Sequence, residues 1–162
     1  PEPSTAGSTV SEKDDPMHLL PATTHSYLFR ATETLAEAIV ADDVPSRYAI
    51  AHVAALQAAA ALIAARADPV EAASRAGRRR PWNAWVRLKK VAPELSEWAD
   101  YFAAGAAKRA AAEAGSIRAV TAEEADEQVR DADRFLAVVE ESLGLVAHTT
   151  AATRLGHDRL VG

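Results

Sequence analysis

The sequence has no cysteine, few aromatic residues and no recognisable targeting pattern. None of its 162 residues is cysteine, and Phe, Trp and Tyr together make up 6%. The absence of cysteine excludes disulfide scaffolds, cysteine-ligated zinc sites and thiol catalysis. No apolar stretch is expected to provide the ~20 residues of a membrane span, and the N-terminus lacks the charged-then-apolar layout of a signal peptide. We therefore expect a soluble, cytoplasmic protein that does not act at a membrane.

Alanine dominates what is present. It supplies 39 of the 162 residues, while hydrophobic residues make up 49% and charged residues 25% of the chain. Alanine is the best helix former and a poor strand former, and the β-branched residues never form alternating runs. The length suits one domain. These features predict an all-α domain whose helices pack closely through small side chains.

The pattern of apolar residues and helix-capping signals divides the chain into three parts. Residues 1–20 are predicted to be a disordered tail, residues 21–144 a helical domain, and residues 145–162 a flexible C-terminal tail. The domain is predicted to be an up-and-down four-helix bundle with an elaborated link between its second and third helices. The first helix is expected after Pro21, with Thr23 or Thr24 as N-cap, and the second from Pro45–Ser46 to about Ala67. A helical segment from Trp82 to Val91 precedes the third helix, which is expected from Pro93 to Ala114 with Gly115 as C′ residue. The fourth is expected from a capping box at Thr121–Glu124 to Gly144.

Arg47 and His52 stand five residues apart near the start of the second predicted helix. Histidine suits general acid–base catalysis near neutral pH, and the guanidinium group of arginine binds two phosphate oxygens at once. Such a pair could cleave RNA, with His52 moving the proton and Arg47 stabilising the phosphoryl charge. Alternatively, His52 is a packed core residue on a stripe with Leu56 and Ile63. Cleavage needs both side chains in a solvent-reachable cleft, so enclosure of His52 within its own bundle would exclude it.

A second candidate site is the basic segment from Arg75 to Lys90. Seven basic residues and no acidic residue occupy its sixteen positions, so a chain of formal net charge −5 carries −12 outside this segment. Clustered arginines with interleaved tryptophans are typical of single-stranded nucleic-acid binding. Alternatively, the tryptophans anchor the segment on the bundle and the arginines are solvated. The candidate binding residues are Arg75, Arg78, Arg79, Arg80, Trp82, Asn83, Trp85, Arg87, Lys89 and Lys90.

The remaining ionisable groups show no further site pattern. The acidic face of the last predicted helix lacks a histidine at ligand spacing, so solvated carboxylates are expected and no metal is predicted. That face comprises Glu123, Glu124, Asp126, Glu127, Asp131 and Asp133. His148 and His157 fall in the predicted tail without a partner pattern. No phosphate-binding loop or dinucleotide fingerprint occurs, so no cofactor is predicted.

Three segments of the chain carry a family resemblance: residues 46–55 (SRYAIAHVAA), 80–85 (RPWNAW) and 91–98 (VAPELSEW). They resemble the HEPN superfamily, and in particular a small alanine-rich subfamily of actinobacteria, and the resemblance extends over about residues 22–143. It implies the four-helix HEPN fold. Many HEPN proteins are metal-independent ribonucleases whose Arg-x4-His motifs meet in a dimer cleft, which implies catalytic roles for Arg47 and His52 in a homodimer.

The resemblance leaves two functions open. In nuclease members a polar residue commonly follows the arginine, whereas Tyr48 stands here, and the motif of many such members lies on a later helix. The first function is a metal-independent endoribonuclease acting on RNA as a homodimer. The second is a non-catalytic interaction module that binds nucleic acid or a protein encoded nearby, in a toxin–antitoxin or DNA-damage-response assembly. A purely structural bundle is least favoured, because it leaves the basic segment unexplained.

Overall fold

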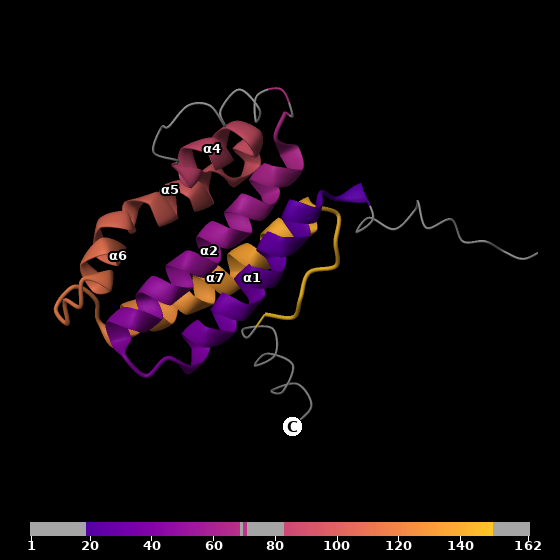
Figure 1. Cartoon of the computed structure of the whole chain (residues 1–162). Coiled ribbons are helices and arrows are strands. Elements are labelled where there is room, and N and C mark those ends of the chain that lie inside the picture. The colour runs from indigo at the N-terminus through magenta and orange to yellow at the C-terminus, as the bar shows by residue number, and fades with distance from the viewer. Residues whose placement is uncertain (1–18, 69, 71–82, 151–162) are drawn as a thin grey trace, which may run out of the picture.

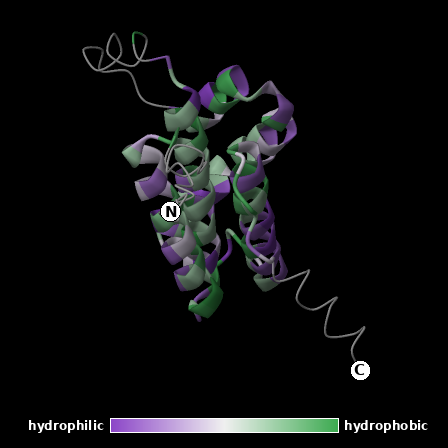
Figure 2. Cartoon of the chain, turned by 90° about the vertical axis from the view of Figure 1, so that its right-hand side faces the viewer, coloured by the Kyte–Doolittle hydropathy of each residue, from purple (hydrophilic) through white to green (hydrophobic). Residues whose placement is uncertain are grey.

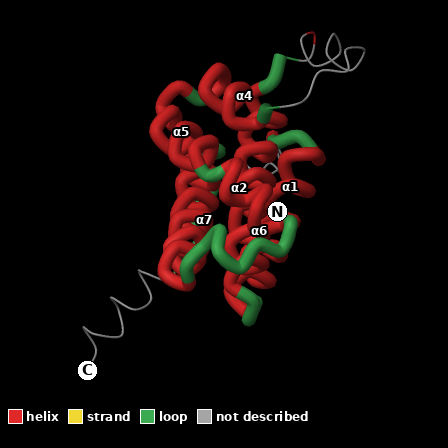
Figure 3. Tube along the Cα trace, turned by 90° about the vertical axis from the view of Figure 1, so that its left-hand side faces the viewer, coloured by secondary structure: helices red, strands yellow, loops and turns green. Residues whose placement is uncertain are grey.

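The computed structural model describes residues 19–68, 70 and 83–150, and within these ranges every regular element is a helix (Figures 1 and 3). The all-α prediction is therefore confirmed for the described part of the chain. The predicted link at residues 70–81, apart from Val70, and most of both predicted tails lie outside the described residues. The elements are α1 (Ala22–Val40), α2 (Val44–Arg66), α4 (Ala84–Val91), the 3-10 helix η3 (Pro93–Leu95), α5 (Ser96–Ala104), α6 (Ala106–Glu113) and α7 (Ala122–Ser142).

Helix α2 is the centre of the fold. It packs against α1, α4, α6 and α7, and a series of alanines from Ala51 to Ala61 is buried along it. Because an alanine side chain is a single methyl group, these positions let neighbouring helices approach closely. In Figure 2 hydrophobic and hydrophilic stretches alternate along the helices, as expected where each helix buries one side.

Helix α2 also corrects one expectation from the sequence. By length and composition its 23 residues are long and apolar enough to cross a membrane, so the expectation that no apolar stretch reaches that length is wrong. Of its most apolar 18-residue window, 67% is buried inside the structure. The apolar surface of α2 therefore serves to pack the other helices around it.

The cap of α1 differs from the prediction. Its N-cap is Pro21 rather than Thr23 or Thr24. Thr24 is fully buried, and its Oγ1 donates a hydrogen bond to the Ala61 carbonyl oxygen across a distance of 3.0 Å. The hydroxyl group is thus unavailable for capping, because it ties α1 to α2 inside the core.

The helix predicted from Pro93 to Ala114 is divided into η3, α5 and α6, with the break between the last two at Gly105. A Cβ atom at Gly105 would lie 2.7 Å from the Tyr48 hydroxyl oxygen. The absence of a side chain therefore lets the α5–α6 junction approach α2. The capping box at Thr121 and Glu124 is confirmed.

The end of α7 is defined by Gly144, as predicted. This glycine has a φ of +77°, and the Leu145 amide donates to the Glu140 carbonyl oxygen at 2.9 Å, which is the bond that closes a Schellman motif. Beyond it the described residues 145–150 do not continue the helix but turn back and run beside α1 (Figure 1). The first part of the predicted flexible tail is therefore in contact with the domain.

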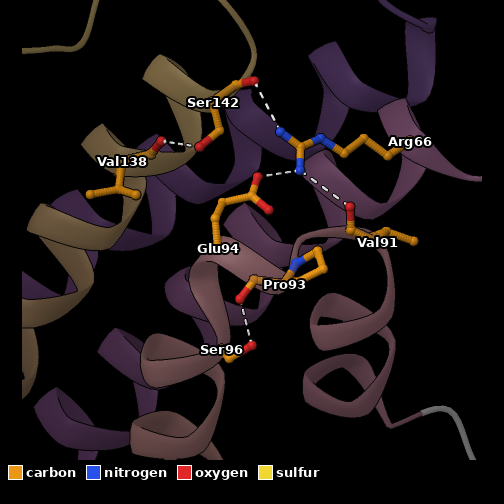
Figure 4. A network of polar contacts seen from close by, with 7 residues as sticks. All are labelled: Arg66, Val91, Pro93, Glu94, Ser96, Val138 and Ser142. Carbon is orange, nitrogen blue, oxygen red and sulfur yellow. Dashed lines mark hydrogen bonds and ion pairs between the residues drawn. The ribbon is translucent and has the colours of Figure 1, made fainter.

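Arg66, at the end of α2, joins three segments (Figure 4). Its Nη1 donates to the Val91 carbonyl oxygen at 3.2 Å and to the Glu94 carboxylate, and its Nη2 donates to the Ser142 carbonyl oxygen at 3.5 Å. Val91 and Ser142 end α4 and α7, where carbonyl groups lack helical partners and favour a positive charge. One guanidinium group thus holds the ends of α2, α4 and α7 together.

Candidate functional site

His52 lies in the aromatic core of the domain. The residue is only 1% exposed. The ring meets Trp85 and Phe102 edge-on, with centroid distances of 5.8 and 5.9 Å. Its Nδ1 lies 3.3 Å from Gln128 Nε2, and since an amide nitrogen only donates, Nδ1 accepts and the proton of the neutral ring resides on Nε2.

This environment strongly disfavours the protonated imidazole. Burial, followed by the positive charge of Arg109, lowers the pKa of His52 to about 4. A general acid–base catalyst works best with a pKa near the operating pH, and it must reach the proton that it transfers. His52 meets neither requirement in the described structure, because it is neutral at pH 7 and surrounded by protein.

The guanidinium group of Arg47 is engaged elsewhere. Its Nη1 lies 2.6 Å from Asp126 Oδ1, and its Nε donates to the Ala41 carbonyl oxygen at 3.0 Å. The Arg47 side chain is 21% exposed. These contacts join the first turn of α2 to α7 and to the end of α1. The described structure therefore does not bring Arg47 and His52 together at an exposed surface, and His52 fits the alternative interpretation of a packed core residue.

The sequence analysis did not identify Tyr101 and Gln128 as polar residues of this region. The Tyr101 hydroxyl lies 3.5 Å from Gln128 Oε1 and 2.6 Å from Asp131 Oδ2. Burial, followed by the hydrogen bond to Asp131, raises the pKa of Tyr101. Gln128 was the residue from which these contacts could have been predicted, because an amide on the core side of an amphipathic helix requires a hydrogen-bonding partner.

Within the described part of the basic segment, Asn83 and Trp85 stabilise the fold. Asn83 is the N-cap of α4, and its Oδ1 accepts from the backbone amides of Trp85 and Val86 at 3.1 and 3.3 Å. Trp85 is 5% exposed and stacks on Phe102 at 5.1 Å. Of the two interpretations of Trp85, the structure supports anchoring of the segment on the bundle, and the assignment of Trp85 as a base-stacking residue is corrected, since its ring is inside the core. Arg75, Arg78, Arg79, Arg80 and Trp82 lie outside the described residues.

Three basic residues of α4 remain near its outer side. Lys89 is exposed and pairs with Asp100 at 2.7 Å. Lys90 is exposed. Arg87 is half-buried, and its Nε has no hydrogen-bond partner among the described residues. Helix α4 thus buries Trp85 against the core while the basic side chains of its other positions remain at least partly accessible.

The acidic face of α7 is not simply solvated, which corrects the expectation from sequence. Four of its six carboxylates contact groups from four other parts of the chain, so this face joins α7 to the rest of the domain. Glu124 pairs with Lys108 of α6 at 2.6 Å, Asp126 with Arg47 of α2 at 2.6 Å, Asp131 accepts from Tyr101 of α5 at 2.6 Å, and Asp133 contacts His148 beyond α7 at 2.6 Å.

The comparisons with known proteins identify the family. A model of the SAV_6107-like HEPN family (HEPN_SAV_6107) matches residues 38–140, more than half of the chain, including Arg47 and His52. Comparisons with curated proteins and with solved structures gave no significant match. The all-helical fold agrees with this assignment, and HEPN domains are modules of nucleic-acid-related proteins, nucleases among them. The resemblance inferred from the three sequence segments is confirmed, and the chain belongs to the SAV_6107-like HEPN family.

Proposed function

We propose that this HEPN protein is a non-catalytic interaction module that binds nucleic acid. The observation that carries the proposal is the enclosure of His52, which is 1% exposed between Trp85 and Phe102. In this function Arg47 and His52 stabilise the fold instead of cleaving RNA. Family membership supports a role connected with nucleic acid.

The packing around His52 opposes cleavage for a physical reason. To reach a ribose hydroxyl, the imidazole would have to leave the rings of Trp85 and Phe102, both of which are buried. That movement would expose two large aromatic side chains and leave Gln128 Nε2 without its partner. Each of these changes costs on the order of 1–3 kcal/mol, and nothing in the described geometry compensates for them.

The basic segment Arg75–Lys90 is the proposed binding segment. Its seven basic residues carry the charge needed to neutralise phosphates, and displacement of the counterions around the nucleic acid would favour binding. Lys89 pairs with Asp100 in the free protein, but both side chains are exposed. An exposed pair contributes about 0–1 kcal/mol, so Lys89 can exchange Asp100 for a phosphate group at little cost.

Cleavage is tested with labelled single-stranded RNA in the presence of a chelator. We expect no cleavage above the buffer control by the wild-type chain. Cleavage that disappears in both Arg47→Lys and His52→Gln, with their circular dichroism spectra unchanged, would instead establish the endoribonuclease. Analytical ultracentrifugation of the same samples would then test the homodimer that the nuclease function requires.

Binding is tested by fluorescence anisotropy with single-stranded RNA and DNA over a range of salt concentrations. We expect affinity to fall steeply with salt, and the variants Arg78→Ala/Arg79→Ala/Arg80→Ala and Lys89→Ala/Lys90→Ala to bind less tightly. Each lost phosphate contact should reduce the logarithmic salt slope by about 0.7. The matched control is Arg118→Ala, an exposed arginine before α7. Absent or salt-insensitive binding would overturn the nucleic-acid partner and favour a protein partner, as in a toxin–antitoxin or DNA-damage-response assembly.

A further inference from the structure

Among the described residues after α7, His148 makes two close polar contacts with the domain. We call residues 145–150 the C-terminal strap. His148 Nε2 lies 2.6 Å from Asp133 Oδ1, and His148 Nδ1 contacts the Glu140 carboxylate. Asp133 and Glu140 are seven residues apart on α7, which places them on the same face two helical turns apart. The imidazole thus bridges two carboxylates with its two nitrogens.

This geometry favours a protonated ring. A neutral imidazole carries one N–H group and one lone pair, so it can donate to only one of the two carboxylates. Its other nitrogen would then direct a lone pair at a negatively charged oxygen. The imidazolium form donates from both nitrogens. The side chains of Asp133 and Glu140 are only 9% and 18% exposed, so water screens these contacts less than it would at an open surface.

The strap lies over a groove between α1 and α7. One cavity, of about 580 Å³, is lined by Leu28, Phe29 and Leu136 together with Leu145 and Val146 of the strap. A second cavity, of about 570 Å³, lies along Leu35, Ile39 and Leu136 and is bordered by His148 and Thr149 of the strap. The groove floor is therefore mostly apolar, and the strap covers part of it.

The charges that act on His148 come from α7. Among the described residues lining its cavity, α7 supplies Asp133 and Glu140, while α1 supplies only uncharged side chains, Thr32, Leu35, Ala36 and Ile39. His25 of α1 lines the neighbouring cavity together with Glu140. Among the described residues that line this cavity, the charged side chains that face the imidazole are thus the two carboxylates.

We propose that the C-terminal strap is a pH-dependent latch. The protonated His148, shared by Asp133 and Glu140, holds the strap over the groove between α1 and α7. Loss of the proton replaces one hydrogen bond by a repulsive contact and releases the strap. Release uncovers the apolar floor around Leu28 and Leu136, so proton concentration controls access to this groove.

The direction of the pH dependence follows from the contacts. Burial lowers the pKa of His148, but the hydrogen bonds to Asp133 and Glu140 and their negative charges outweigh it, and the net shift is upward from 6.5. Closing the latch therefore takes up a proton. Closure is strongest below pH 6.5 and is lost as the pH rises through the raised pKa, with the closing equilibrium changing by at most about tenfold per pH unit.

The test is amide hydrogen exchange of the strap in the full chain between pH 5.5 and 8.5, together with NMR titration of the His148 ring nitrogens. Exchange is expressed as protection factors, which remove the intrinsic pH dependence of the amides. We expect strap protection to fall as the pH rises and the His148 ring to titrate over the same range. In His148→Gln, protection should be low and independent of pH.

Matched variants separate the latch from general effects. Glu140→Gln should lower strap protection at pH 5.5, whereas Glu141→Gln, the neighbouring carboxylate on α7, should leave it unchanged. His25→Gln should retain the pH dependence of the wild type. Wild-type protection that is constant over the whole range, or a pH dependence that persists in His148→Gln, would overturn the proposal.

Discussion

His52 and His148 occupy contrasting environments within one small domain. His52 is enclosed by Trp85 and Phe102, and burial lowers its pKa to about 4. His148 lies between the carboxylates of Asp133 and Glu140, whose effect exceeds that of burial and raises its pKa. The same side chain is therefore disfavoured as a cation in the core and favoured as a cation between two carboxylates.

The contrast teaches that partners from other helices decide what a histidine does. Helices α4 and α5 present aromatic rings to His52, and a cation gains no opposite charge there. Helix α7 presents two carboxylates to His148. Because desolvation disfavours the charged ring and carboxylates favour it, the two regions respond to pH in opposite directions.

The largest expected effect is the loss of the His52 side chain. His52→Ala should lower the free energy of unfolding at pH 7 by about 3–4 kcal/mol, through a cavity in the core and an unsatisfied Gln128 amide. His148→Ala should lower it by less than about 1 kcal/mol at the same pH. Urea unfolding followed by circular dichroism measures both. Equal losses from the two variants would remove the distinction between core and surface histidine.

The next prediction concerns the free energy of unfolding at acid pH. The unfolded chain protonates His52 below pH 6.5, whereas the folded chain resists protonation until about pH 4. The unfolded state therefore binds more protons in this window, and stability falls as the pH is lowered. Between pH 6.5 and 4.5 the contribution of His52 should be about 2–3 kcal/mol. Urea unfolding at several pH values should show a shallower decline in His52→Leu, and parallel curves for the two proteins would contradict the assignment.

Gly105→Ala tests how tightly the His52 region is packed. The new Cβ would lie 2.7 Å from the Tyr48 hydroxyl oxygen and 3.9 Å from His52 Nδ1. We expect a loss of about 1–2 kcal/mol, as for other overpacked positions. In a Tyr48→Phe background the same change should cost less, because the nearest oxygen is absent. A double-mutant cycle measures this coupling, and simple additivity would show that the contact is not the cause.

The smallest expected effect concerns the stability contributed by His148. His148→Gln should reduce the free energy of unfolding by about 0.5–1 kcal/mol at pH 5.5, since hydrogen bonds between partly exposed charged groups contribute that much. The difference should shrink toward zero as the pH rises through the raised pKa. Thermal unfolding at both ends of the range provides the measurement. A loss that grows with pH would reverse the sign assigned to this histidine.

Much of the fold could be predicted from local chemistry. The helical class followed from alanine content, and the start of α7 followed from the Thr121–Glu124 capping box, because both depend on residues adjacent in sequence. The position of Gly144 at a helix end was predicted for the same reason. The break at Gly105 and the burial of Thr24 could not be predicted, since each depends on a contact with α2 from a distant part of the chain.

The candidate site was predicted less well than the fold. The spacing of Arg47 and His52 and the resemblance of three segments led to the HEPN family, which the family model confirms. The spacing did not reveal that Asp126 binds Arg47 or that aromatic rings enclose His52. It also suggested no partner for His148, whose two carboxylates stand eight and fifteen residues away in sequence.

The sequence by itself determined the helical class, several helix ends and the family, because helix propensity, capping and sequence motifs depend on residues that are close together in the chain. Only the tertiary structure decided which charges are paired, which tryptophan is buried and which histidine can hold a proton. The physical reason is that desolvation and Coulomb interactions depend on distances in space. Those distances are set when α2, α5, α7 and the C-terminal strap come together.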